Sequence, residues 1–302
     1  MRTLTILAGL FVVIGVFACD GWTPALAQDQ DADVRGAFLT TRPKTSEKST
    51  GTAPTSRPNR RRPKQTSKPA DKVEKPSVSD EKASDGGSAK IRTPKIGMGL
   101  TLFARDSNGL AVRVDPTRTF HTGDRVRALL ETNVDGYLYI FNTTDGGKPV
   151  MIYPNPELDE GGNYIQSHVP FEIPASVAEQ ERLRWLTFDK YPGTERLFFV
   201  FTREPLPSVP TEDELISFCK DNEKNCPIQP APDLWAKIQT EMKGPVQIAK
   251  SDSYGKSQTD GERTATTRGL GLSKDDPEPS MVMMAVSTNT QMLVAMLELI
   301  HK

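Results

Sequence analysis

The chain has 302 residues, of which 36% are hydrophobic, 7% are aromatic and 25% are charged, and its mean hydropathy is −0.48. This apolar content is low for a chain of that length, so we expect part of the sequence to lie outside any packed core. A formal net charge of −1 argues against nucleic-acid binding through overall positive charge.

The first 27 residues have the pattern of a secretory signal peptide. Arg2 supplies the positive start, an apolar run extends from Leu4 to Ala18, and small residues at 25 and 27 form a cleavage site. The run is shorter than the roughly 20 residues that a membrane-spanning helix needs. We therefore expect cleavage after Ala27, export to the periplasm or the medium, and no transmembrane segment in the mature chain. A second interpretation is a lipoprotein modified at Cys19, although the bulky Phe17 fits a lipobox poorly.

Removal of the signal peptide also removes one of the three cysteines, which leaves Cys219 and Cys226. An exported protein is expected to oxidise such a pair to a structural disulfide. It would close a loop of about eight residues and contribute roughly 2–3 kcal/mol. A redox or metal pair is the alternative, but redox motifs use C-x-x-C and zinc needs more ligands. The three histidines show no ligand spacing, and no metal site is predicted.

Residues 28–95 are predicted to be a disordered, proline-rich basic linker. Its main part, residues 42–95, holds 15 lysines and arginines against six acidic residues, for a net charge of +9. The same part has seven prolines and no Leu, Met, Phe, Trp or Tyr, so it cannot bury enough apolar area to offset its ordering entropy. Residues 96–302 carry the compensating net charge of −8.

The most basic stretch of this linker comprises Arg60, Arg61, Arg62 and Lys64. Such a run is typical of nuclear signals and nucleic-acid patches, but export removes that context. Two interpretations remain: a solvated spacer, or weak contact with an anionic envelope polymer or membrane surface.

From Ile96 onward, short alternating apolar runs and Asp-Gly turns predict antiparallel β-structure. We expect one mainly β, sandwich-like domain over residues 96–302 with two short helices. The first three clear strands are predicted to form a meander. The strands are expected at 126–133, 137–141, 149–153, 168–173, 184–188 and 195–202.

The C-terminal part is expected to begin with two helices. One opens at the capping box formed by Thr211 and Glu214, and the other covers Pro232 to Met242 with an apolar face. Residues 244–280 are polar and are predicted to be a mobile excursion. The apolar segments 281–287 and 292–300 fit one helix or a hairpin, and the turn residues between them favour the hairpin.

Several short motifs follow one another in a fixed order. They are F-x-x-G-D-x-V at 120–126, G-Y-L-Y-I-F at 136–141, Y-P-N at 153–155, I-P at 173–174 and P-G-x-E at 192–195. In this order they resemble the bacterial domain of unknown function 4384 over about residues 119–205, and Leu297 to His301 look like the closing strand of longer relatives. The resemblance implies an envelope or secreted protein without an established activity, and it transfers no functional residues.

No nucleophile elbow, phosphate-binding loop, zinc box or dinucleotide fingerprint occurs, so no catalytic, cofactor or metal residues are predicted. Tyr137, Tyr139 and Phe141 could line a ligand groove, but cross-strand packing accounts for them better. We expect a non-enzymatic binding or assembly module of the cell envelope, whose partner is an envelope protein or an anionic polymer. The alternative is a secreted enzyme with a dispersed site. Convergent polar groups with shifted pKa values in a pocket would favour the enzyme, and a shallow groove or exposed edge strand would favour the binding module.

Overall fold

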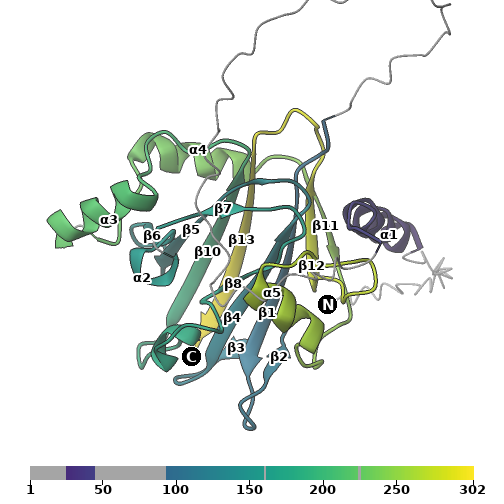
Figure 1. The fold of residues 1–302 in the computed structure, drawn as a ribbon, viewed down its shortest axis with the longest axis horizontal. Coiled ribbons are helices and arrows are strands. Elements are labelled where there is room, and N and C mark those ends of the chain that lie inside the picture. The colour runs from purple at the N-terminus through teal and green to yellow at the C-terminus, as the bar shows by residue number, and fades with distance from the viewer. Residues whose placement is uncertain (1–24, 45–92, 160, 224–225) are drawn as a thin grey trace, which may run out of the picture.

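The computed structural model describes residues 25–44, 93–159, 161–223 and 226–302. Two β-sheets face each other and make a mainly β sandwich, as expected (Figure 1). Sheet A has the order β11-β12-β1-β4-β8, with β2 beside β1 and β9 beside β4. Its strands are β1 (Gly97–Arg105), β2 (Ala111–Arg113), β4 (Arg125–Thr132), β8 (Phe171–Ile173), β9 (Leu186–Thr187), β11 (Val246–Lys250) and β12 (Met281–Ala285).

Sheet B has the order β3-β13-β10-β5-β6, with β7 beside β5. Its strands are β3 (Thr119–Phe120), β5 (Gly136–Thr144), β6 (Val150–Tyr153), β7 (Tyr164–Ile165), β10 (Gly193–Thr202) and β13 (Met292–His301). The short β3 runs parallel to β13, whereas all other paired strands are antiparallel.

The core between the sheets follows from the two-residue period of the strands. Leu138 and Ile140 of β5 and Phe199 of β10 point inward and are fully buried. The alternate residues Tyr137 and Tyr139 point to the opposite face and belong to a separate apolar cluster. The sequence interpretation of the tyrosines as packing residues is therefore confirmed.

The outer face of sheet B is covered by α3 (Glu212–Asp221) and α4 (Pro232–Met242), with the one-turn α2 (Pro156–Asp159) in contact with α3. Both longer helices lie where the sequence predicts them. The Cys219–Cys226 disulfide is present, with its Cα atoms 5.2 Å apart, and it ties α3 to the loop that follows.

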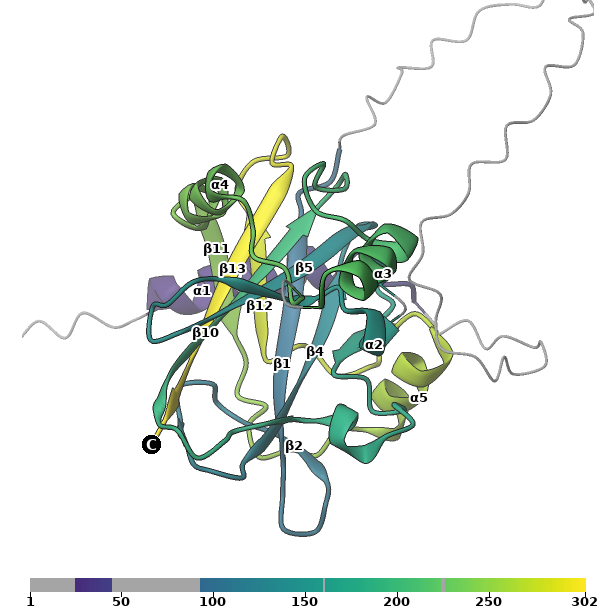
Figure 2. The same cartoon turned by 90° about the vertical axis from the view of Figure 1, so that its left-hand side faces the viewer.

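Residues 25–44 differ from the expected linker. They form α1 (Ala25–Leu39), which spans the predicted cleavage point, and a short docked segment after it (Figures 1 and 2). Val34 and Phe38 lie one helical turn apart and are buried against β11 and β12. Gly97 of β1 makes room for this helix, because a Cβ there would lie 2.9 Å from the Phe38 ring. The linker prediction was based on the composition of the segment as a whole, which does not reveal two apolar residues spaced for one helix face. Residues 1–24 and 45–92, with most of the signal and the arginine run, lie outside the described residues.

Two predicted pairings are wrong, although the strands themselves are present. β4 and β5 do not form a meander, because β4 belongs to sheet A and β5 to sheet B. β12 and β13 are likewise strands of different sheets and not a hairpin. A turn motif shows that the chain reverses, but it does not say which strand the returning segment will pair with.

Residues 244–280, predicted to be a mobile excursion, contain a strand and a helix. β11 pairs with β12 along its whole length, and α5 (Asp260–Arg268) covers part of the outer face of sheet A (Figure 1). The polar composition misled the prediction, because this segment is anchored by buried ion pairs and hydrogen bonds and less by apolar side chains. Glu262 is 2% exposed and pairs with Arg113 of β2.

Candidate functional site

An open groove lies between the two sheets at one end of the sandwich and has a volume of about 250 Å³. We call it the inter-sheet groove. Most of its wall is apolar, with a few polar side chains among the apolar ones. Its lining residues are Val126, Asn142, Ile152, Leu186, Thr187, Phe188, Asp189, Glu195, Leu197, Leu299 and His301.

A β-bulge shapes the wall that β6 contributes. Ile140 of β5 pairs with Tyr153, but its neighbour Phe141 pairs with Met151, so Ile152 has no cross-strand partner in this register. A bulge of this kind redirects a side chain from its regular position. Ile152 lines the inter-sheet groove.

Glu195 supplies a fixed carboxylate to the groove. Its Oε2 accepts hydrogen bonds from Asn142 Nδ2 at 2.8 Å and from Thr144 Oγ1 at 2.9 Å, both on the neighbouring strand β5. Asn142 Oδ1 is buried and has no hydrogen-bond partner among the described residues. A buried acceptor without a partner costs on the order of 1–3 kcal/mol.

His301 closes the groove at the end of β13. It is 5% exposed, and its ring centroid lies 5.2 Å from that of Phe188. Its Nε2 lies 3.4 Å from Thr122 Oγ1. The Phe188 ring also stacks on Phe120 at 4.8 Å, so the aromatic side of the groove is held by packing from two strands and a loop.

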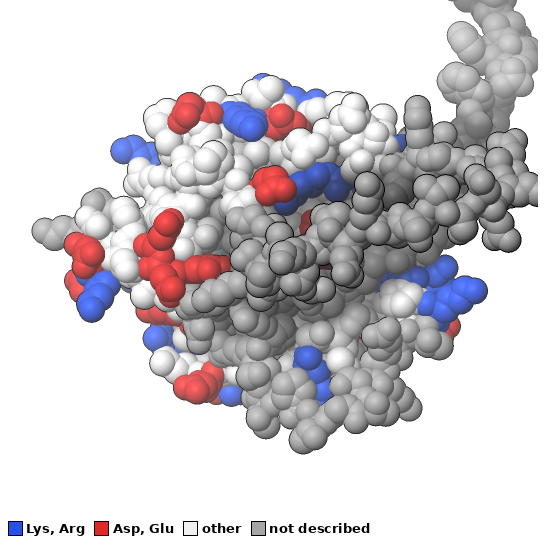
Figure 3. Space-filling view, turned by 45° about the horizontal axis from the view of Figure 1, so that its top comes forward, with Lys and Arg blue, Asp and Glu red and all other residues white. Residues whose placement is uncertain are grey.

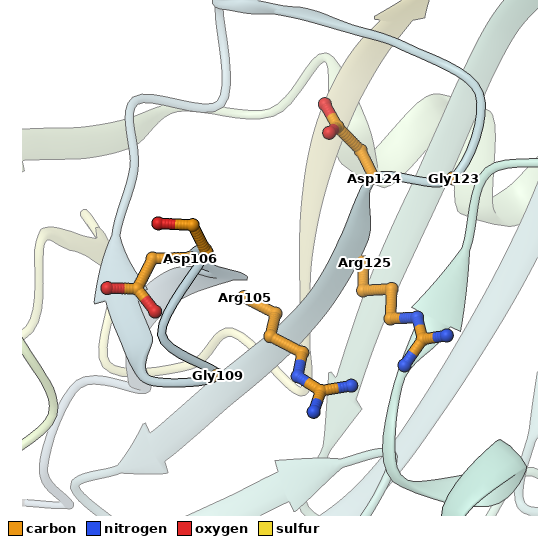
Figure 4. Close-up of a pocket in the computed structure, with 7 residues that line it drawn as sticks. Arg105, Asp106, Gly109, Gly123, Asp124 and Arg125 are labelled. Atoms are coloured by element: carbon orange, nitrogen blue, oxygen red, sulfur yellow. The ribbon is translucent and has the colours of Figure 1, made fainter.

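A second hollow lies at the tip of sheet A, between the β1–β2 turn and the β3–β4 turn (Figure 4). This tip pocket has a volume of about 340 Å³ and a polar lining. Arg105 and Arg125 flank the paired residues Ala104 and Val126, and their side chains extend in the same direction in Figure 4. Both guanidinium groups reach Glu181, at 3.3 and 3.8 Å.

The two carboxylates of the tip pocket are occupied by their own turns. Asp106 Oδ1 accepts from the backbone N–H groups of Asn108 and Leu110, and Asp124 Oδ2 accepts from the N–H of His121. The charges of this pocket are thus balanced locally and exposed. Such contacts contribute little net energy and define no particular ligand.

A third polar cluster lies beneath α5 and the 270–280 segment, on the outer face of sheet A. Arg42, Glu131, Arg127 and Glu172 are all at most 5% exposed. Burial lowers the pKa of the Arg127 guanidinium, and the charge of Glu172 opposes that shift. The cavity beside Glu131 has only about 10 Å³, which is too little for more than one water, so we interpret the cluster as structural.

The structure tests only some of the site residues predicted from the sequence. The structure joins Cys219 and Cys226, whereas the run from Arg60 to Lys64 lies outside the described residues. Sequence reasoning missed Glu195 and Asn142. The available signal was that Glu195 lies two residues before the inward-facing Leu197 on a strand, which places an acidic side chain on the inner face of a sheet.

The charged surface is uneven. Acidic side chains gather at the left of Figure 3, where α3 lies in Figure 1, and the first turn of α3 contains Glu212, Asp213 and Glu214. Among the described residues, no helix is both long and apolar enough to cross a membrane. Within the same residues, no cluster of three or more His, Cys, Asp and Glu has the arrangement of a metal site.

The protein is thus a mainly β sandwich with an open groove between its two sheets. Within it, residues 119–205 match the family described as "Domain of unknown function (DUF4384)", which confirms the resemblance seen in the sequence motifs. No curated protein and no solved structure matches the chain. The matched segment contributes most of the groove, whereas Leu299 and His301 come from β13, outside it.

Proposed function

We propose that the chain is an exported, non-enzymatic binding or assembly module of the bacterial cell envelope and that the inter-sheet groove is its ligand site. The groove is the observation that carries this proposal. Small-molecule and peptide sites are concave and mostly apolar, with a few placed polar groups, and the groove combines Leu197, Leu299 and Phe188 with Glu195 in that way.

Two independent features support export. The first 27 residues have the order of charge, apolar run and small residues found in signal peptides. The Cys219–Cys226 disulfide is typical of proteins that reside in an oxidising compartment. Mass spectrometry of the exported protein should find an N-terminus at Gln28, and a lipid-modified Cys19 would contradict periplasmic release.

The basic stretch from Arg60 to Lys64 is proposed to give a second, weaker contact, with anionic envelope polymers. It contains no aromatic residue, so its attraction is Coulombic and is screened above physiological ionic strength, where the Debye length falls below about 8 Å. Glutamine at all four basic positions should remove salt-sensitive retention on envelope fragments. The melting temperature should not change.

A blocking substitution tests the groove directly. Thr187 is exposed and lines the groove, so Thr187→Trp should fill it without disturbing the core. Thr288→Trp places the same side chain on the exposed β12–β13 connection and is the matched control. In a pull-down from envelope extracts at physiological salt, with glutamine at the four basic positions of every variant, Thr187→Trp should lose the partner that the unblocked chain and the control retain. Equal retention by both variants would overturn the groove as the ligand site.

A further inference from the structure

The charge of the inter-sheet groove has one sign. Glu195 and Asp189 are carboxylates, and neither lysine nor arginine is among the lining residues. Lys190, next in sequence, lies over the Tyr191 ring at 5.2 Å from its centroid. A negatively charged groove with apolar walls complements a ligand that joins an aliphatic chain to a positive charge.

The hydrogen bonds that Glu195 already accepts distinguish between the two kinds of positively charged side chain. Asn142 and Thr144 already donate to its Oε2. Its Oε1 has no hydrogen-bond partner in the described part of the chain, so one carboxylate oxygen is left for a ligand. A guanidinium binds carboxylates best through two parallel hydrogen bonds, which this arrangement does not offer, whereas an ammonium group binds as a compact point charge.

The groove also matches the aliphatic part of such a ligand, because most of its wall is apolar. The four methylene groups of a lysine side chain can lie along the apolar wall that Leu197 and Leu299 provide, as lysine stems do on apolar surfaces elsewhere.

From these observations we infer that the inter-sheet groove binds a lysine side chain presented by a partner polypeptide. This inference rests on the proposed binding function and specifies its ligand. Glu195 holds the ammonium group, Asn142 positions Glu195, and the apolar wall takes the aliphatic stem.

The test uses the chain from Gln28 to Lys302 and short peptides that differ at one residue. Titration with N-acetylated, C-amidated Gly-Gly-Lys-Gly-Gly, followed by NMR, should shift the backbone signals of Ile152, Leu197 and Leu299 in a saturable way. The acetyl-lysine and norleucine peptides, capped in the same way, should bind at least about tenfold more weakly, since each lacks the positive charge. Glu195→Gln should weaken lysine binding by a similar factor. Glu298→Gln, on the outer face of the neighbouring strand, should leave it unchanged.

Each alternative outcome has a defined meaning. Equal binding of the lysine and norleucine peptides would overturn the ammonium site, and so would undiminished binding by a folded Glu195→Gln variant. Binding of pentylammonium without binding of the lysine peptide would show that a free amine is the ligand and would overturn the polypeptide partner. In all these cases the Thr187→Trp pull-down still decides the binding function separately. Unchanged thermal unfolding of Glu195→Gln is the control for its fold, because glutamine can still accept from Asn142 and Thr144.

Discussion

The outer faces of the two sheets are covered in different ways. On sheet B the seal is apolar: Ile238 of α4 is fully buried, and Trp235 contacts Phe141 and Phe198 edge to face. On sheet A the seal beneath α5 and residues 40–43 consists largely of ion pairs, such as Arg42 with Glu131. One face of the sandwich is thus closed by packing, whereas the other is closed by packing beneath α1 and largely by charge beneath α5.

The difference teaches where this fold is intolerant of change. An apolar contact loses energy in proportion to the atoms removed, and neighbours can partly relax into the space. A buried ion pair gains little over an apolar pair of similar size, but the loss of one partner leaves an uncompensated charge. The face of sheet A should therefore be the more sensitive to single substitutions and the more tolerant of paired ones.

The largest effect is expected at Arg42. Its guanidinium donates two hydrogen bonds to Glu131, at 2.8 and 2.6 Å, and three more to backbone carbonyls of residues 273–277. Arg42→Met should lower the free energy of unfolding by about 3–5 kcal/mol, because the buried Glu131 loses its guanidinium partner and keeps only the contact with His168 Nδ1 at 2.7 Å. Urea denaturation measures this, and the double variant with Glu131→Leu should recover part of the loss, since His168 then loses its Glu131 partner. If the single variant lost less than about 1 kcal/mol, charge would not be what closes this face.

The apolar face should respond less strongly. Ile238→Ala should cost about 3 kcal/mol, because the side chain is fully buried between α4 and sheet B. Lys237→Ala, one residue earlier and exposed, is the control and should change stability by less than about 0.5 kcal/mol. A loss at Ile238 larger than that at Arg42 would reverse the comparison between the two faces.

The disulfide should matter less still. Replacing Cys219 and Cys226 together with serine should destabilise the chain by about 2 kcal/mol, because the closed loop is short. Because the bond holds the end of α3, backbone amides of α3 should exchange hydrogen faster, whereas those of β1 should not. Faster exchange in both would mean that the bond supports the whole sandwich.

The smallest expected effect is on alkaline stability. Burial, the hydrogen bond to Asp135 and its negative charge raise the pKa of Tyr164 to about 12. The folded state thus holds this proton more tightly than the unfolded state, whose tyrosine pKa is about 10. Its contribution is complete below pH 10 and is lost as the pH rises towards 12. Comparison with Tyr164→Phe across this range, with absorbance at alkaline pH, should reveal a steeper loss in the natural chain. Parallel curves would contradict the shift.

The sequence predicts secondary structure well wherever a periodic pattern of apolar residues defines the element. β10 and both helices on sheet B were found from apolar patterns, because each is decided by residues near in sequence. Strand partners were missed because pairing is a long-range choice. β1, for example, lies between β12 and β4, from opposite ends of the domain.

The helix-capping motif at Thr211 shows the same effect of contacts that are distant in sequence. The predicted capping box at Thr211 does not form: Glu212 has φ 52° and its N–H donates to Gly161, so the first turn is distorted by a distant segment. The same motif at Thr259 and Glu262 forms fully, in a stretch predicted to be mobile. The groove was missed because Glu195 and Leu299 meet only after β10 pairs with β13.

The segment that matches the family does not complete the sandwich. Residues 119–205 contain β3 and β10, but β13, which joins them in sheet B, lies about 90 residues further along. Sheet A likewise lacks β1 without the residues before 119. The structural unit is therefore larger than the recognisable motif.

The docking of residues 31–44 brings Arg42 close to the point where the described chain resumes. Arg42 is fixed on Glu131, and the carbonyl of Lys95 accepts a hydrogen bond from Asn133 Nδ2, two residues further along the same chain. The intervening chain therefore leaves and rejoins the folded unit at neighbouring points. A single cut within it would produce two polypeptides that remain associated through the Phe38 and Arg42 contacts.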